Sequence, residues 1–546
     1  MLWIAVHLPL LSLESFVSTL PGDLRERPVA LMDAHAILAV NPAARALGVQ
    51  PPMKRATALS LAPQLTLGVA DAVRDAEALR AVAHAALAFT PMVVFQPPGD
   101  ARAAASGGNR ADPRAGNPID NPIHEGADTV LLEVHASLRY FGGLPALLQR
   151  LQAALAPLGH QLQIVSAATP LGAALLARIH PRLDCADLAA TRRALARAPV
   201  WLLGPGRAHW EALQGMGLRT IDDLARVPRD GLARRFGPVV LDELDRATGA
   251  RPDPRDPLTL PACFESRLEL FARADTTEQL LHGASVLLAR LVAWLSAQHG
   301  FVRRFSLVML HEQRSRHDAP TAAVTTLEVA LAEPSRDSAH LLVLLRERLA
   351  QLQLPAPTLD LRLHAEDIVR RAPPNTELFP TSASEQEGLT RLIERLQARL
   401  GREQVVRLIA LQDHRPERAT ASRPADAQMR PARARSAAEQ PPTPRPASHA
   451  VRPVWLLQQP VPLSTRALTT GASAEGFAES GPWADGQPLQ LLSGPERIES
   501  GWWDADLVER DYYIAQLPGG ALVWVYRLRV PRAPTETHWF MQGRFG

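Results

Sequence analysis

The sequence has few of the residues on which disulfide frameworks, zinc sites and membrane spans depend. Its two cysteines, Cys185 and Cys263, lack a CxxC partner and a neighbouring histidine cluster, which argues against structural zinc and against a disulfide-stapled secreted domain. The longest internal apolar run, VLLARLVAWLSA, is too short to cross a bilayer and contains Arg290. No Lys or Arg precedes the apolar N-terminal stretch, and Glu14 interrupts it, unlike a signal peptide. We therefore expect a cytoplasmic protein that does not enter a membrane.

Lysine is almost missing as well. Lys54 is the single lysine among 59 basic residues, and 56 acidic residues leave a net charge of only +3. Arginine suits bidentate recognition of phosphate, but codon bias also enriches arginine, so the bulk composition supports nucleic-acid binding weakly. The 546 residues, 46% of them hydrophobic, are enough for three to five domains.

The first part of the chain alternates strand-like and helix-like segments. Residues 2–8, 28–33 and 36–41 are predicted strands around the amphipathic segment SLESFVSTL, and residues 71–89 have apolar residues at helical spacing. Residues 98–127 are rich in Gly, Pro, Asn and Ala, which is typical of a disordered insertion in a hairpin loop. We expect an α+β domain over residues 1–182.

The next two regions differ in character. Residues 183–258 are predicted to be helical with two glycine-centred turns, GPG at 204–206 and GMG at 215–217. Such turns are found in helix-hairpin-helix modules, where free backbone amides hold a DNA phosphate, and also in ordinary αα-turns with glycine caps. Residues 259–370 alternate strands and two long helices in the order β-α-β-β-α-β, which predicts a split-βαβ sandwich. The residues of the expected phosphate contact are Gly204, Gly206, Gly215, Gly217, Arg219, Arg234 and Arg235.

The C-terminal part contains a peptide, a linker and a small module. A non-periodic peptide followed by a helix occupies residues 371–415, and Pro, Ala and Arg bias in residues 416–452 predicts a disordered linker. Residues 453–546 return to strand-like patterning with many aromatic side chains, which predicts a small β-rich module.

The chain resembles the Y-family translesion DNA polymerases, and among them the ImuB-type members. LWIAVHLPLLSLESF is similar to the first palm strand, AVNPAARALGVQPPMKRATALSLAPQLTL to the fingers, and DTVLLEVHASLRYFGG to the second catalytic strand. The resemblance implies a palm and fingers over residues 1–182, a helix-hairpin-helix thumb over 183–258 and a little finger over 259–370. GWWDADLVERDYYIAQLPGGALVWVYRL and WFMQGRFG resemble the ImuB-type tail.

The resemblance places the catalytic carboxylates of active relatives at four positions, of which this chain keeps one. The first pair falls on His7 and Pro9, and the second pair on Asp128 and Thr129. Nucleotidyl transfer needs two divalent cations held by several carboxylate oxygens, and imidazole and proline do not rebuild such an oxygen cage. We therefore expect no catalytic residue, no metal and no cofactor, and a non-catalytic adaptor in DNA-damage tolerance.

Two alternatives remain open. The first is an active error-prone polymerase that binds Mg²⁺ through a rearranged site, with Asp128 joined by Glu125 or Glu133, although the odd spacing places Glu133 on the opposite sheet face. The second is a structural scaffold without DNA affinity.

The resemblance also suggests weak nucleotide contacts and non-specific contacts with primer-template DNA. Arg45 of NPAAR is kept, but the aromatic hydroxyl expected three residues earlier is Pro42, and Ser12 replaces the bulky aromatic that excludes ribonucleotides. Phosphate contacts position a protein on DNA without reading its sequence. Solvated or edge-protecting charges are the alternative interpretation. The expected contacts of the fingers and little finger are Arg45, Lys54, Arg55, Arg303 and Arg304.

Two features suggest protein partners. PPNTELFPTS resembles the peptide with which proteins bind the bacterial sliding clamp, and its anchors are Asn375, Leu378 and Phe379; QLQLP at 351–355 is a weaker candidate. The ImuB-type tail implies docking of a RecA-like ImuA protein and an error-prone C-family polymerase. Several of its rings are needed for a core. The expected docking residues are Trp502, Trp503, Tyr512, Tyr513, Trp539 and Phe540.

Overall fold

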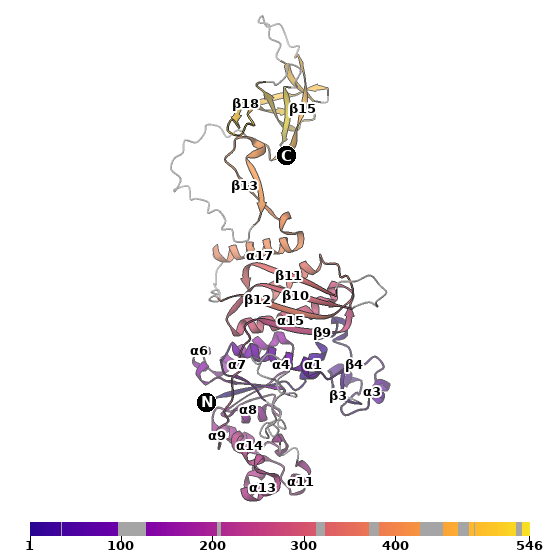
Figure 1. Ribbon diagram of the computed structural model, residues 1–546, viewed down its shortest axis with the longest axis vertical. Coiled ribbons are helices and arrows are strands. Elements are labelled where there is room, and N and C mark those ends of the chain that lie inside the picture. The colour runs from indigo at the N-terminus through magenta and orange to yellow at the C-terminus, as the bar shows by residue number, and fades with distance from the viewer. Residues whose placement is uncertain are drawn as a thin grey trace. The chain divides into compact units, whose positions relative to one another are not determined.

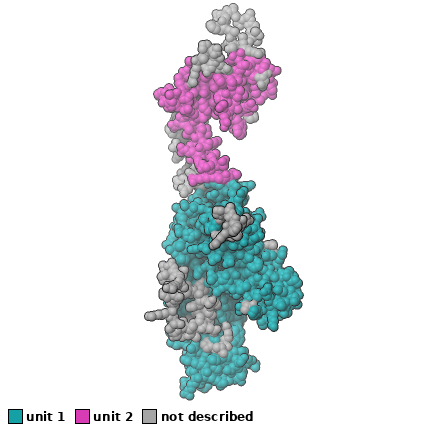
Figure 2. Space-filling view, turned by 45° about the vertical axis from the view of Figure 1, so that its right-hand side comes forward, with its two compact units in different colours: residues 1–399 teal, residues 400–546 magenta. Residues whose placement is uncertain are grey.

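The computed structural model describes residues 1–33, 35–96, 127–204, 209–312, 323–370, 382–425, 451–467, 480–484, 486–530 and 538–545. The chain forms two compact units, residues 1–399 and 400–546 (Figure 2). The first unit combines helices with mixed and antiparallel sheets, and the second consists mainly of strands (Figure 1). The expected α+β multidomain architecture with a β-rich C-terminal module is therefore confirmed.

A five-stranded sheet forms the palm, in the order β5-β6-β1-β7-β8. Its central strand β1 (Trp3–His7) pairs antiparallel with both neighbours, and all five of its residues are buried. A strand covered on both faces has a continuous apolar sequence, which accounts for LWIAVHL. The other strands are β5 (Val93–Gln96), β6 (Thr129–Glu133), β7 (Gln163–Ala167) and β8 (Arg182–Asp184).

Helices cover both faces of this sheet. One face packs against α4 (Ala72–Leu87) and α7 (Leu144–Leu155), and the other against α8 (Pro170–Ala177) and α9 (Leu188–Ala196). The fingers form a smaller sheet in the order β3-β2-β4, made of β2 (Val29–Asp33), β3 (Ala36–Val40) and β4 (Thr66–Val69). Short helices accompany it: α1 (Leu11–Val17), α2 (Pro42–Ala46) and α3 (Arg55–Leu61).

The thumb is helical, and its apolar residues continue the core beneath α8 and α9. Its α12 (Ile221–Arg226) begins at a capping box, in which the Thr220 hydroxyl accepts from the Asp223 N–H and the Asp223 carboxylate accepts from the Thr220 N–H. Gly217 has a φ of +79°, which favours glycine at the turn before that helix. The other thumb helices are α11 (Trp210–Gly215), α13 (Arg229–Phe236) and α14 (Pro238–Thr248).

The little finger has the element order expected from the sequence. Its four strands form an antiparallel sheet in the order β11-β10-β12-β9. By length and composition α15 (Thr277–Ala297) resembles a membrane span, but 56% of its apolar window is buried inside the structure, as in a core helix. The remaining elements are β9 (Phe264–Ala274), β10 (Gly300–His311), β11 (Val324–Ser335), α16 (Ser338–Leu349) and β12 (Thr358–Arg370). Helix α17 (Ser382–Leu400) follows.

In the second unit, a seven-stranded sheet has the order β17-β16-β15-β21-β20-β19-β18. A separate ribbon pairs β13 (Val406–Ala410) with β14 (Thr420–Pro424). Residues 420–424, which were expected to belong to a disordered linker, therefore form a strand. The strands of the large sheet are β15 (Trp455–Ala467), β16 (Ser480–Ala484), β17 (Gln487–Pro488), β18 (Gln490–Ser500), β19 (Val508–Gln516), β20 (Leu522–Leu528) and β21 (Trp539–Arg544).

Two expected disordered segments lie almost wholly outside the described residues. These are the insertion at 98–127, of which only Ala127 is described, and the linker beyond residue 425. Ala127 is buried beside β6, so the ordered palm resumes one residue earlier than expected.

Candidate functional site

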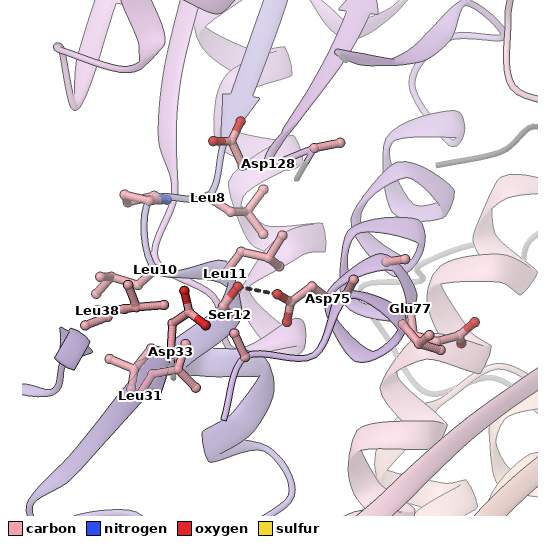
Figure 3. A pocket seen from close by; sticks show the side chains of 18 of the residues that line it. Leu8, Leu10, Leu11, Ser12, Leu31, Asp33, Leu38, Asp75, Glu77 and Asp128 are labelled. Atoms are coloured by element: carbon pink, nitrogen blue, oxygen red, sulfur yellow. Dashed lines mark hydrogen bonds between the residues drawn. The ribbon is translucent and has the colours of Figure 1, made fainter. Parts of the chain in front are cut away.

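A cavity of about 1030 Å³ opens where the palm meets the fingers (Figure 3). It is lined by the chain that leaves β1, by α1, β2 and β3, by the start of α4, and by the residues that enter β6. The cavity therefore lies beside the end of β1 and the start of β6, where Pro9 and Asp128 line it. Leucines form much of its wall: Leu8, Leu10, Leu11, Leu13, Leu31 and Leu38.

Three of the four predicted carboxylate positions meet at one edge of this cavity. His7 ends β1 directly opposite Thr129, the first residue of β6. The Thr129 hydroxyl donates to Asp128 Oδ1 at 2.8 Å and accepts from His7 Nδ1 at 3.0 Å. Pro9 lines the cavity but supplies no metal ligand. Asp128 is therefore the single carboxylate among the four positions.

Arg178 compensates the charge of Asp128. Arg178 is the C-cap residue of α8. Its Nη2 donates to both Asp128 carboxylate oxygens, at 3.1 and 3.3 Å. Burial raises the pKa of Asp128, but the hydrogen bond from His7 and the positive charge of Arg178 outweigh it and hold this pKa at about 2. The carboxylate is ionised at neutral pH, and its negative charge is neutralised within the protein. No local sequence pattern indicates this pair, because 50 residues separate its members.

The other acidic residues do not assemble around Asp128. Glu133 pairs with Trp3, at the opposite end of β1 from His7, about 13 Å away along the strand. Glu125 lies outside the described residues. In the described part of the chain no group of three or more His, Cys, Asp or Glu residues is placed to hold a metal ion.

Further acidic residues line the cavity. The hydroxyls of Ser12 and Ser15 donate to the two oxygens of Asp75, which belongs to the first turn of α4. Figure 3 shows the hydrogen bond from Ser12 to Asp75. Ser12, where active relatives have a bulky aromatic side chain, therefore joins α1 to α4. Asp33 and Glu77 also line the cavity, and Arg80 is the one arginine among the described residues that line it. Sequence reasoning missed Asp75, because a carboxylate in the first turn is common in helices.

The predicted nucleotide-clasping residues lie on the exterior of the fingers. Arg45, Lys54 and Arg55 are all exposed, and none of them lines the cavity. Arg45 is in the last turn of α2, and Arg55 begins α3. Their exposure is compatible with phosphate contact on a DNA surface, but their positions do not suit binding of a triphosphate inside the cavity.

The thumb offers fewer free amides than the glycine pattern indicated. The Gly204 N–H donates to Glu243 Oε1 at 3.2 Å, so this amide is not free to bind a phosphate. Gly206 lies outside the described residues. Gly215 ends α11 and Gly217 forms the following turn. Arginines around these glycines are exposed: Arg219, Arg234 and Arg235.

In the little finger, the expected DNA-facing arginines are exposed on β10. Arg303 and Arg304 follow a bulge at Val302, and Arg304 Nη1 lies 3.4 Å from Glu328 Oε1. Arg267 and Arg362 on the neighbouring strands both pair with Asp360. This sheet thus carries carboxylates beside its arginines, which weakens its attraction for phosphate.

The aromatic tail separates into exposed and core residues. Trp502 and Trp503 are exposed, at 78% and 53%. Tyr512 and Trp539 were expected to dock partners, but they are buried in the sheet core because small modules need rings to fill it. Tyr513 and Phe540 are half-buried beside them. The clamp anchors Asn375, Leu378 and Phe379 lie outside the described residues.

The chain is similar to a known protein family and to known proteins. Residues 13–115 match the impB/mucB/samB family. Protein ImuB of Caulobacter vibrioides, in strains NA1000 / CB15N and ATCC 19089 / CIP 103742 / CB 15, is 26% identical over 510 residues, which cover 92% of this chain and 100% of the relative.

Similar solved structures include DinB from Sulfolobus solfataricus (14% identity, TM-score 0.34) and the insertion ternary complex of Dbh DNA polymerase (14% identity, TM-score 0.36). Each match covers 68% of this chain and 100% of the solved chain. The predicted resemblance is therefore confirmed as a similarity: residues 13–115 match the impB/mucB/samB family, and 92% of the chain is similar to Protein ImuB of Caulobacter vibrioides.

Proposed function

We propose that this protein is a non-catalytic, polymerase-like adaptor in DNA-damage tolerance. It holds primer-template DNA without sequence preference, while a separate error-prone polymerase carries out translesion synthesis. The observation that carries this proposal is the Arg178–Asp128 ion pair, at 3.1 Å, in a palm where the neighbouring positions are His7, Pro9 and Thr129. One charge-compensated carboxylate does not supply the oxygen ligands of two magnesium ions.

The cavity itself supports the same proposal. Its wall is rich in leucine, and its charged lining consists of four carboxylates and one arginine, Arg80, whose guanidinium pairs with Glu77. A nucleoside triphosphate carries several negative charges, which such a lining repels unless cations or arginines intervene. The exposed arginines of the fingers, thumb and little finger instead suit the DNA backbone, whose contacts are non-specific.

Partners follow from the similarity to ImuB and from the sequence. We propose that the peptide containing Asn375, Leu378 and Phe379 binds the bacterial sliding clamp, and that the C-terminal unit docks an error-prone C-family polymerase and a RecA-like ImuA protein. The described aromatic pair Trp502 and Trp503 supports docking, because exposed tryptophans are enriched at binding hot spots.

The primary test is primer extension by the purified full-length protein, with Mg²⁺ or Mn²⁺. We expect no nucleotide addition by the wild type, and none by Arg178→Ala, because freeing Asp128 still leaves a single carboxylate. An active polymerase added to the same mixture is the control for the substrate. Extension by the wild type that Asp128→Ala abolishes would establish the alternative, an active error-prone polymerase with a rearranged Mg²⁺ site.

A further inference from the structure

The loop between β18 and β19, residues 501–507, presents two tryptophans to solvent. Trp502 and Trp503 are 78% and 53% exposed, and their rings meet edge to face with centroids 5.4 Å apart. Neither ring belongs to the aromatic core of the sheet, where Tyr512 stacks on Trp524. Leu507, at the end of the loop, is 50% exposed. Several large apolar side chains are therefore exposed on one short loop.

A buried arginine from a distant part of the sequence holds this loop. Arg415 is 1% exposed, and its Nη1 and Nη2 donate to the two carboxylate oxygens of Asp504 at 3.0 and 2.6 Å. Arg415 Nη1 also donates to the backbone oxygen of Asp506 at 3.1 Å, and Nε donates to Asp413 at 3.0 Å. The planar guanidinium thus binds both a side-chain carboxylate and a backbone carbonyl of the loop.

Further contacts fix the loop. Arg418 donates to Asp504 and to Asp506, each at 2.8 Å. Gly501 has a φ of +90°, and a Cβ at this position would lie 2.1 Å from the Asp506 backbone oxygen. The Arg415 guanidinium also lies 5.6 Å from the Trp503 ring centre. The loop is therefore held by its backbone and carboxylates, while most of the Trp502 indole remains in water.

This arrangement favours binding over core packing. Ordering a loop in advance reduces the entropy lost on association, and tryptophan in a fixed position is a frequent hot spot. The local charge identifies the class of partner. Among the described residues, the carboxylates of Asp413, Asp504 and Asp506 pair with the two arginines Arg415 and Arg418, so three negative charges face two positive charges. Single-stranded nucleic acid also stacks on tryptophan, but it requires a positively charged groove.

We propose that Arg415 positions Trp502 and Trp503 as a preformed contact for an apolar pocket on a protein partner. This inference rests on the proposed adaptor function and assigns its docking contact to one loop. Arg415 is a positioning residue, which acts through Asp504 and Asp506. The pocket that receives the indoles is apolar and has no acidic rim, because acidic groups would face the carboxylates of the loop.

The test uses the full-length chain and three purified probes: the RecA-like ImuA protein, the error-prone C-family polymerase, and a labelled single-stranded oligonucleotide. Trp502→Ala/Trp503→Ala is expected to weaken binding of one protein probe at least tenfold. The matched control is Trp455→Ala, because Trp455 is 70% exposed elsewhere in the same unit. That control is expected to change affinity less than twofold.

Arg415 is tested separately because its loss perturbs the loop rather than the indoles. Arg415→Met is expected to increase amide exchange in residues 501–507 and to weaken the same protein probe, while amide exchange in β19 and β20 stays unchanged. Arg415→Lys is expected to restore little of the lost binding, because an ammonium group does not reproduce the planar, forked geometry of the guanidinium.

The outcomes separate this inference from the proposed function. Undiminished binding of both protein probes by the double tryptophan variant would overturn the inference and leave the adaptor function standing. Failure of the wild type to bind either protein would overturn both. Oligonucleotide binding that depends on the tryptophans, without an effect on the proteins, would replace the protein partner with nucleic acid.

Discussion

At the residue scale, the pKa values of the half-buried Asp128 and the buried His84 are both lowered, which leaves the first group charged and the second neutral. Arg178 and His7 lower the pKa of Asp128 to about 2, so this carboxylate stays ionised. Burial, with a contribution from Arg80, lowers the pKa of His84 in α4 to about 3, so this imidazole stays neutral in the folded protein. One group has a counter-charge and the other is desolvated, which are the two principal ways in which a fold moves a pKa.

His84 predicts acid sensitivity of the palm. Its ordinary pKa of 6.5 applies in the unfolded chain and about 3 in the folded chain, so between these values the unfolded state binds the extra proton. Stability therefore falls as the pH decreases below 6.5, and the loss attributable to His84 is about 1.4 kcal/mol between pH 7.5 and 5.5. His84→Leu removes this loss. Denaturant unfolding at both pH values measures it.

The exposed His135 provides the matched control. We expect His135→Gln to show the same pH dependence as the wild type, because His135 is exposed and lies outside the buried core. Equal acid sensitivity of His84→Leu and the wild type would show that His84 is protonated in the folded protein.

At the scale of elements, the periodic segments were predictable and the long-range pairs were not. Residues 2–8, 28–33 and 36–41 contain the strands expected there, and the β-α-β-β-α-β order of the little finger followed from alternation and apolar spacing. The pairs Arg178–Asp128 and Arg415–Asp504 leave no local pattern, since 50 and 89 residues separate their members. Strand β14 was missed because its sequence TASRP is polar and has no core face to bury.

The palm and little finger share a buried polar contact between α4 and α15. Arg290 on α15 is 5% exposed and lies 4.0 Å from Glu77 on α4, and both side chains hydrogen-bond to Ser266 of β9. Burial lowers the pKa of Arg290, and the charge of Glu77 opposes this effect. An apolar contact, Phe16 against Phe271 with ring centres 5.3 Å apart, accompanies it.

Because of this contact, a single substitution is expected to destabilise the protein more than a substitution of both partners. Glu77→Gln leaves the buried Arg290 without its counter-charge and is expected to cost about 3 kcal/mol, whereas Glu77→Gln/Arg290→Met recovers most of the loss. Glu269→Gln, at an exposed carboxylate of β9, is the control and should change stability by less than about 0.5 kcal/mol. Denaturant titration with a fluorophore in the little finger measures the change. No recovery in the double variant would mean that the pair itself stabilises the contact.

At the scale of the whole molecule, an α+β multidomain architecture is combined with a palm whose described residues place no group of three or more His, Cys, Asp or Glu side chains to hold a metal ion. The sequence alone shows that His7, Pro9 and Thr129 replace three of the four expected carboxylates, and the loss of catalysis that this suggests stays a prediction. The sequence was not enough to predict the strength of DNA binding, because that depends on which arginines have carboxylate neighbours. Arg304 lies beside Glu328, and Arg267 and Arg362 share Asp360.

DNA binding by the complete chain should therefore depend on salt, with unequal contributions from the two β10 arginines. Each phosphate contact contributes about 0.9 to the slope of log K against log salt. Arg303→Ala is expected to reduce the slope by about 1, and Arg304→Ala by less, because Glu328 already neutralises part of the charge of Arg304.

The measurement is fluorescence anisotropy with primed DNA across a salt series. Arg346→Ala/Arg348→Ala, at two exposed arginines of α16, is the control and should preserve the slope. An unchanged slope in Arg303→Ala/Arg304→Ala would remove the little finger from the DNA-binding surface, and a wild type without measurable affinity at low salt would favour a structural scaffold.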